Sequence, residues 1–309
     1  MPNIWTHILF CEELVDVTEM ATGFNRKDEA YLNLGAQGPD PFFYYNFWPW
    51  KAKSPVNDIG LILHTEQCGK FLMNMIKGAK SGSRAIKAYV IGFVTHHILD
   101  RNTHPFIHYH AGYEKNKHQQ LEIIIDTIMM ERFKNLKTWR APVYKEMDIS
   151  RKLDYALINM LYQNIKKVYS PIGTPKNYIQ ASFRDMILAL KVLHDPHGWK
   201  NSILRSAISS FSHQPVSNNG VDYLNDNEQI WFHPATNEAS TKSFLTLYEQ
   251  ARAEGLEILP EIINYWERPF GTDVIENESK LEKLIGNVSY DTGLPLDLNY
   301  SNQYARPII

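Results

Sequence analysis

The segment Lys117–Lys134 combines an apolar helical pattern with three polar side chains on a single stripe. His118, Glu122 and Asp126 stand four residues apart, so on a helix they project from the same side. The residues between them are apolar on nearly every side, which predicts a buried helix. Because a buried, uncompensated carboxylate costs several kcal/mol or becomes protonated, this pattern indicates a bound cation.

An alternative is that Glu122 and Asp126 pair with arginines from other segments, such as Arg101 or Arg132. No lysine or arginine lies between Lys117 and Arg132 to serve locally, so we favour a metal ion. The arginine alternative would also leave a second, similar pattern unexplained.

This second pattern lies in the predicted helix Arg84–Arg101. His96 and Asp100 are again four residues apart and can share one metal ion. Gly92 lies one turn earlier on the same face, where it leaves room for another backbone or for an ion. His97 follows the apolar stripe, so we interpret it as a packed residue and His96 as the ligand.

The composition of the chain limits the classes of protein to which it can belong. The 309 residues are 44% apolar, which is enough for a sizeable core in one large domain or two ordinary ones. A net charge of −2 does not suit a long nucleic acid as partner. Cys11 and Cys68 alone form no disulfide framework and suit a reducing compartment. We find no leader pattern and no apolar run that could span a membrane, and we expect a soluble, cytoplasmic protein.

Helical periodicity dominates the chain, which predicts an all-α fold. The sequence predicts no oligomeric state. A turn region at Thr138–Tyr144 divides a metal-binding helical core, residues 1–140, from a helical extension, residues 141–309, packed on it as one continuous unit. Gln214–Ser240 is predicted to be a long surface loop or a small flap. The expected helices are Thr6–Met20 with Thr6 as its cap, Ile59–Lys77, Arg84–Arg101, Lys117–Lys134, Ile149–Tyr169, Ala181–His194, Ser202–Phe211, Thr241–Glu254 and Leu259–Trp266.

The order of several motifs is distinctive. They are Gly38-Pro39-Asp40-Pro41-Phe42, then His64, then Thr95-His96-His97-Ile98-Leu99-Asp100, then His104-Pro105, then His118-x-x-x-Glu122. In this order they resemble the zinc-dependent phospholipase C family, which is all-helical and distantly related to the single-strand-specific zinc nucleases. The resemblance covers roughly residues 5 to 130. It implies a bundle of this type, with additional helices at the C-terminal end.

The resemblance also implies a set of metal ligands for two or three zinc ions, although iron or manganese would suit the same donors. Asp40 and Asp100 are the residues that it implies in catalysis: Asp40 beside the attacking water, and Asp100 as a bridge between two metals. The implied ligands are His7, Asp40, His64, His96, Asp100, His104, His118 and Glu122.

Several positions depart from the family pattern or leave alternatives open. Secreted members bind one zinc through an N-terminal tryptophan, whereas Trp5 is internal here. His108 is a rival to His104 as ligand, because His104 precedes its proline whereas the family's proline comes first. His110 is expected to be a solvated loop residue. Asp126 is expected to support the site indirectly, by steadying His118 or a metal-bound water.

The expected activity is hydrolysis of a phosphoester, either a small molecule or a phospholipid, by a metal-bound hydroxide. Alternatives are a histidine-aspartate phosphohydrolase acting on a soluble nucleotide and a metal-stabilised scaffold without catalysis. The aromatic run Phe42–Trp50 either forms a lip of the site or packs between helices, and most of its rings are expected to pack. The later histidines are interpreted as structural, namely His194, His197, His213 and His233.

Overall fold

The computed structural model describes residues 3–18, 24–114, 116–149, 152–169, 174–175, 177–204, 208–268 and 274–309. In this part of the chain the fold is all-helical, as predicted, with one short antiparallel hairpin that pairs Trp231 with Ser240. The helices and strands are α1 (Ile4–Val17), α2 (Arg26–Gly35), η1 (Asp40–Tyr44), α3 (Pro55–Thr65), α4 (Cys68–Ala79), α5 (Arg84–Ala111), α6 (Lys117–Lys134), η2 (Val143–Lys145), α7 (Tyr155–Tyr169), α8 (Tyr178–Leu193), α9 (Trp199–Leu204), β1 (Trp231–Phe232), β2 (Ala239–Ser240), α10 (Phe244–Glu267), α11 (Val274–Ile285) and η4 (Leu296–Leu298).

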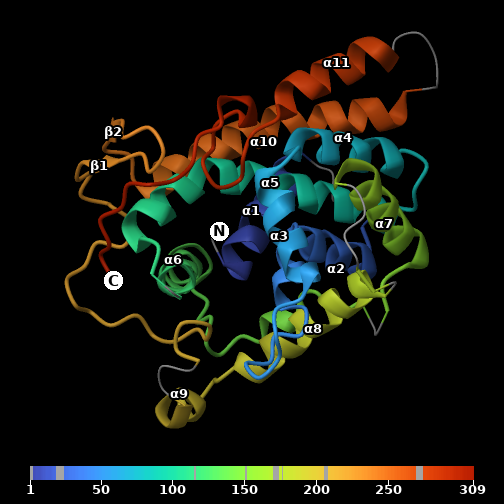
Figure 1. The fold of residues 1–309 in the computed structure, drawn as a ribbon. Helices are drawn as coiled ribbons and strands as arrows, with labels where there is room; N and C mark the ends of the chain where they lie inside the picture. The colour runs from blue at the N-terminus through green and yellow to red at the C-terminus, as the bar shows by residue number, and fades with distance from the viewer. Residues whose placement is uncertain are drawn as a thin grey trace.

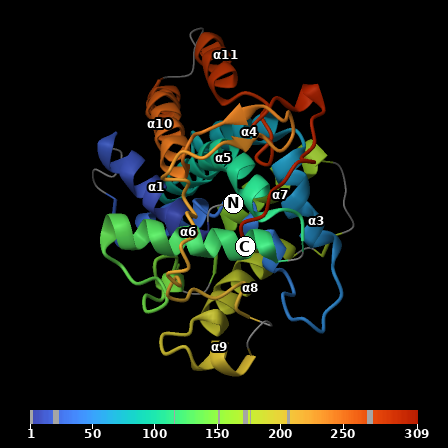
Figure 2. The same ribbon diagram turned by 90° about the vertical axis from the view of Figure 1, so that its left-hand side faces the viewer.

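Helix α5 is the centre of the architecture. It packs against α1, α2, α4, α6 and α10, and it crosses the middle of the molecule in Figure 1. Figure 2 shows α6 running across the neighbouring face, with α8 and α9 below it. A single hydrophobic core extends from Ile4 in α1 to Ile285 in α11. Within the described residues, no helix combines the length and apolar character that a bilayer crossing requires.

Two glycines let α2 and α5 touch backbone to backbone. A Cβ atom on Gly35 would lie 2.0 Å from the carbonyl oxygen of Tyr89, and one on Gly92 would lie 2.2 Å from that of Leu32. The space at Gly92 is therefore occupied by another backbone and not by an ion. The crossing places the turn after α2, with Gly38 and Asp40, directly against His96.

Helix α5 continues to Ala111, so the predicted end at Arg101 is wrong. Pro105 inside the helix has no N–H to offer the carbonyl of Arg101. Gly293, with φ +65°, packs onto that carbonyl, and a Cβ there would lie 2.2 Å from its oxygen. The C-terminal segment thus covers the gap in the hydrogen-bond ladder, and the helix passes through the proline.

The longer helix changes the positions of the later histidines. His104 and His108 now follow His96 and Asp100 at intervals of four residues on one α5 stripe. His110 is helical and half-buried against the rings of Phe106 and Trp231, so the prediction of a solvated loop is wrong.

Other boundaries also differ from the sequence predictions. Helix α1 begins at Ile4 after Asn3, and Thr6 lies inside it. The predicted Ile59–Lys77 helix is split into α3 and α4 by Gln67, whose φ is +46°. Helix α10 runs unbroken through Pro260 where two helices were predicted, and α2 and α11 were not predicted. Helix α7 starts later than expected, and α8 starts and ends earlier. Helix α9 begins at Trp199, before the predicted Ser202, and residues 205–207 of the predicted Ser202–Phe211 helix lie outside the described residues.

We expect Gly92→Ala to destabilise the fold by roughly 1–3 kcal/mol or more, because the added methyl group meets backbone atoms that cannot move independently. Urea denaturation gives the measurement. Gly78→Ala is the matched control, since its Cβ would lie 3.2 Å from the flexible Met160 side chain on an exposed part of α4. Equal unfolding midpoints for the two variants would contradict the proposed backbone contact.

Candidate metal centre

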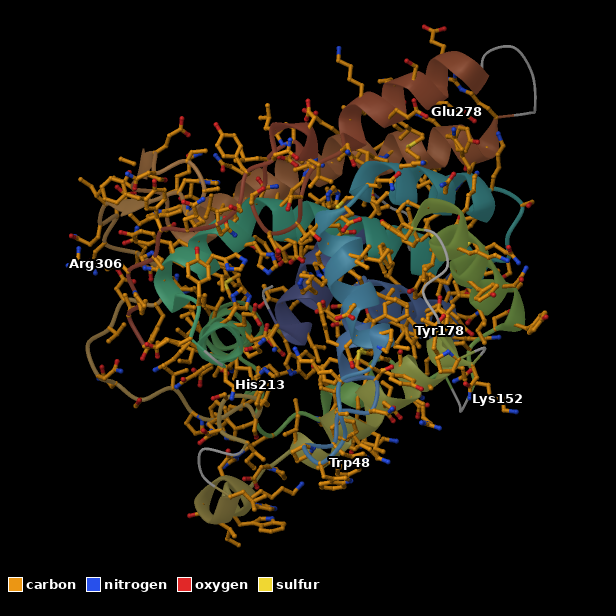
Figure 3. All side chains as sticks on the ribbon, in the orientation of Figure 1. Trp48, Lys152, Tyr178, His213, Glu278 and Arg306 are labelled. Atoms are coloured by element: carbon orange, nitrogen blue, oxygen red, sulfur yellow. The ribbon has the colours of Figure 1, made fainter. Side chains whose placement is uncertain are left out.

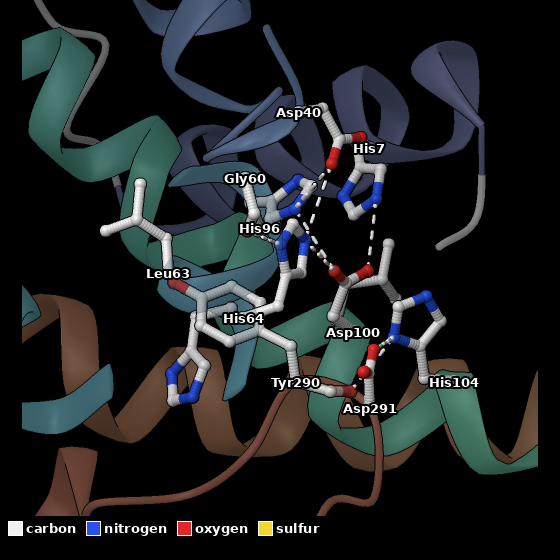
Figure 4. Close-up of polar contacts among 12 residues, drawn as sticks. His7, Asp40, Gly60, Leu63, His64, His96, Asp100, His104, Tyr290 and Asp291 are labelled. Carbon is white, nitrogen blue, oxygen red and sulfur yellow. Dashed lines mark hydrogen bonds and ion pairs between the residues drawn. The ribbon is translucent and has the colours of Figure 1, made fainter. Parts of the chain in front are cut away.

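A first group of polar side chains converges from four elements at the middle of the bundle (Figure 4). Helix α5 supplies two of its members, one turn apart, and α1, η1 and α3 supply one each. The members are His7, Asp40, His64, His96 and Asp100. All are buried except Asp40, whose side chain is 16% exposed.

Asp100 lies between histidines on both of its oxygens. Its Oδ1 is 3.3 Å from Nε2 of His7, whereas its Oδ2 is 3.1 Å from Nε2 of His96 and 3.9 Å from that of His64. Asp40 approaches from the opposite side, with its Oδ1 3.4 Å from His64 Nε2 and 4.0 Å from His96 Nε2. Asp100 thus lies between two neighbouring sets of imidazole nitrogens, with His7 facing one of its oxygens and His96 and His64 facing the other.

Backbone carbonyls fix the orientation of two of these rings. Nδ1 of His96 donates to the carbonyl of Ala36 at 2.9 Å, and Nδ1 of His64 donates to that of Gly60 at 2.6 Å. With Nδ1 engaged in these bonds, each ring turns its Nε2 towards the carboxylates. The His7 and His96 rings are stacked, with their centroids 4.1 Å apart.

Five of the facing atoms in this group lack hydrogen-bond partners among the described residues. They include Nε2 of His7 and His96, Oδ1 of Asp40 and both oxygens of Asp100. Buried polar atoms without partners are rare in folded proteins and require an explanation. Tetrahedral zinc with bonds of about 2.0–2.2 Å holds its ligand atoms roughly 3.3–3.6 Å apart. Two of the observed spacings, 3.3 Å and 3.4 Å, lie in this range, and the others run from 3.1 Å to 4.0 Å around it, so the residues present suit a metal ion.

The charges of the group support the same assignment. Burial alone would raise the pKa of Asp100, but its histidine neighbours, chiefly His96, hold the pKa well below its usual range. Burial lowers the pKa of His7, with a further contribution from His96, so this ring has a free lone pair at neutral pH. Burial also opposes the charge on His64, but Asp40 outweighs it and raises the His64 pKa. A metal ion bound here would therefore displace a proton from His64.

A second group lies one turn further along α5. His104 Nε2 lies 4.0 Å from Oε1 of Glu122, and His118 Nε2 lies 2.5 Å from the same oxygen. Burial and Glu122 act in opposite directions on His118, and the net effect lowers its pKa to about 4. Burial opposes ionisation of Glu122, but His118 outweighs it and lowers the Glu122 pKa to about 2. At neutral pH this group offers a carboxylate and an unprotonated imidazole.

His104 and its rival, His108, both belong to candidate ligand groups. Nδ1 of His104 donates to the carbonyl of Tyr290 at 3.0 Å, which turns its Nε2 towards Glu122. His108 instead forms a third group with His104 and Asp291, and its Nε2 lies 3.7 Å from Asp291. All eight sequence-predicted ligands are thus brought together, five in the first group and three in the second.

Asp291 and Tyr290 were missed by the sequence analysis. The Asp291 carboxylate lies 3.4 Å from Nδ1 of His104. Burial opposes ionisation of Asp291, but the neighbouring His104 and His108 outweigh it and hold the Asp291 pKa well below its usual range. The ring of Tyr290 packs against three histidines, at 4.9 Å from His64 and 4.4 Å from His97. These residues lie in a turn, so helical spacing gave no signal, although the Asp291-Thr292-Gly293 sequence is typical of a turn.

Asp126 has a different partner from the one predicted. Its carboxylate accepts hydrogen bonds from the backbone N–H groups of Trp5 at 3.0 Å and Thr6 at 2.8 Å, and it lies 3.0 Å from Nε2 of His213. It therefore holds the first turn of α1 in place and does not steady His118. The backbone amide of Trp5 is occupied by this contact, and Met1 and Pro2 lie outside the described residues.

The arginine alternative does not fit the structure. Arg101 donates to Glu254 at 2.8 Å and to the carbonyl of Ile285, and Arg132 pairs with Asp226. Neither contact involves Glu122 or Asp126.

Two further histidines, His97 and His233, make structural contacts. His97 is buried with its Nε2 3.0 Å from the carbonyl of Val288, and burial lowers its pKa to about 3, in line with the packed role expected for it. His233 contacts the carbonyl of Thr292 in a similar way. The adjacent pair His194-Asp195 lies after α8, where Asp195 binds Asn201, and it belongs to none of the ligand groups in the described chain. The histidine-aspartate phosphohydrolase alternative therefore has no support in the geometry.

Histidines and carboxylates that converge from several helices define the molecule as a helical metalloprotein. The comparisons with known proteins agree, because a model of the family described as zinc dependent phospholipase C matches residues 6–172, more than half of the chain. The chain belongs to this family of phosphoric diester hydrolases, as its motifs indicated. No curated protein and no solved structure matched it.

We expect His96→Gln to lose at least one equivalent of bound metal, because the variant removes an Nε2 that faces both Asp40 and Asp100. His97→Gln is the matched control. It changes the next residue on the same helix, is equally buried, and can still donate to the Val288 carbonyl. Elemental analysis after gel filtration gives the measurement. Equal metal content in both variants would contradict the assignment of His96.

We expect Asp291→Asn to weaken the binding of a metal at the second group by roughly 10–100-fold, the usual cost of losing a carboxylate behind a ligating histidine. Competition with a chromophoric chelator measures this affinity. Asp297→Asn, an exposed change in η4, serves as the control. If both variants kept wild-type affinity, Asp291 would have no part in orienting His104.

Proposed function

We propose that the protein is a zinc-dependent phosphodiesterase that releases the headgroup of a phospholipid. The observation that carries the proposal is the position of Asp100, a fully buried carboxylate with one oxygen towards His7 and the other towards His96. The second ligand group follows one turn later at His104. This arrangement supports two or three zinc ions, and iron or manganese would suit the same nitrogen and oxygen donors.

Bound metal ions would supply charge stabilisation for the phosphoryl oxygens and a lowered pKa for an attacking water. The residues of the chain supply the remaining functions. Asp100 holds its negative charge among the histidines, because its pKa lies well below the usual range. Asp40 is the partly exposed carboxylate of the first group, and from there it can orient an incoming water and accept its proton.

Two features support a phospholipid as the substrate. The matching family is described as a phospholipase C family. The ring of Phe43, which is 41% exposed, stacks on His64 with the ring centroids 5.5 Å apart. An apolar surface thus begins directly beside the ligand group and suits the glycerol end of a lipid.

We also propose a reducing, cytoplasmic location. Cys11 and Cys68 are both buried and free, and burial raises the pKa of each thiol to about 12, which keeps them unreactive.

We expect Asp40→Asn to lower kcat by roughly 10²–10⁴-fold, the usual contribution of a positioned acid or base. Turnover is measured on phosphatidylcholine, a small chromogenic diester and single-stranded nucleic acid. Chelation should abolish activity and added zinc should restore it.

Asp58→Asn, an exposed change in α3, is the control and should retain full activity. A protein that holds its metal but hydrolyses none of the three substrates would be a metal-stabilised scaffold, and the proposed function would be wrong.

A further inference from the structure

The loop that follows η1 presents a stack of three aromatic rings, in which Phe47 and Trp48 are half-buried and Trp50 is exposed. The rings of Phe47 and Trp48 stack with their centroids 4.5 Å apart, and those of Trp48 and Trp50 with theirs 4.9 Å apart. Trp50 is 72% exposed, although a tryptophan gains more than most residues from burial. Most of the other rings in the aromatic run are partly or fully buried, but this stack extends away from the core. Figure 3 shows Trp48 at the lower edge of the molecule.

Helix α9 presents a second exposed apolar group at the same edge. Trp199 is 55% exposed, Ile203 is 70% exposed and Leu204 is 51% exposed. Figures 1 and 2 both show α9 as the lowest element of the fold. Lys200 fixes α9 to the end of α8 by donating to the carbonyls of Val192 and His194.

Helix α8 connects the two groups. The loop is attached to it by a hydrogen bond of 3.0 Å from the backbone N–H of Asn46 to Asp185. Leu188 and Val192, which follow Asp185 at intervals of three and four residues, are 39% and 40% exposed. Exposed apolar side chains therefore continue along α8 from the loop to α9. We call this surface the apolar edge, and its members are Trp48, Trp50, Leu188, Val192, Trp199, Ile203 and Leu204.

Lysines accompany the tryptophans of the loop. Lys51 directly follows Trp50 and Lys53 lies two residues further on, and both are exposed. Exposed indole rings beside lysines are typical of segments that lie in the headgroup region of a bilayer, where the rings enter the interface and the ammonium groups bind anionic lipids. The loop also begins only a few residues after Asp40 in η1, so a bilayer bound there would lie near the ligand group.

We propose that the apolar edge, with Lys51 and Lys53, docks the protein onto an anionic phospholipid bilayer. The proposal deepens the proposed function, since it explains how an enzyme of this kind would reach a substrate embedded in a membrane. Docking itself requires no turnover, and it can be measured separately from catalysis.

Cosedimentation with sucrose-loaded vesicles tests the proposal. The vesicles consist of phosphatidylcholine alone or mixed with phosphatidylglycerol. We expect Trp50→Ala and Trp199→Ala each to lower the partition coefficient about tenfold on both kinds of vesicle. Lys51→Glu should lower it roughly fivefold or more on the anionic vesicles only.

Tyr155→Ala is the matched control, because Tyr155 is 82% exposed but lies at the start of α7, away from the apolar edge. All four variants should hydrolyse the small soluble diester at the wild-type rate.

Wild-type binding by the tryptophan variants, or no binding of the wild type to either vesicle, would overturn the docking proposal. A loss of dimerisation in Trp50→Ala without a change in vesicle binding would also overturn it, by assigning the surface to a second copy of the chain. Vesicle binding without hydrolysis of any diester would instead count against the proposed function alone.

Discussion

The structure depends on the cost of placing Asp100 inside the bundle. Its carboxylate is fully buried, and the Nε2 atoms of His7, His64 and His96 face its oxygens. An isolated charge in this position would cost several kcal/mol, and a cation held together with these histidines would offset that cost. Stability and metal content would then be coupled, as in other small centres whose ligands are assembled only by folding.

Helix α5 organises that centre because its polar residues recur every four positions. His96, Asp100, His104 and His108 form one stripe, and the carbonyls of neighbouring segments orient the rings. The close crossing with α2 through Gly92 holds η1 against this stripe and so places Asp40. The same η1 leads into the exposed tryptophan stack, so catalytic positioning and the proposed membrane contact share one short segment.

Helical spacing predicted the all-α fold and the His96–Asp100 and His118–Glu122 pairs, because these patterns lie within single helices. It could not predict contacts made between distant segments. Asp126 fits the same stripe as Glu122, yet its partners are backbone amides in α1, about 120 residues earlier. The predicted helix ended at Arg101, but the distant Gly293 covers the Arg101 carbonyl that Pro105 leaves open. Asp291 stands alone in a turn, where no periodicity marks a ligand-supporting residue.

The contact between His104 and the carbonyl of Tyr290 joins residues that are 186 positions apart. During synthesis, the helices that carry the ligands leave the ribosome long before the turn that completes their surroundings. Non-local contacts of this kind form late, since a long loop must close first. A nascent chain would hold its histidines in a half-built pocket until the turn at Tyr290 has been made. Metal loading is therefore expected to follow synthesis of this turn, and fragments that end before it would bind metal poorly even with every ligand present.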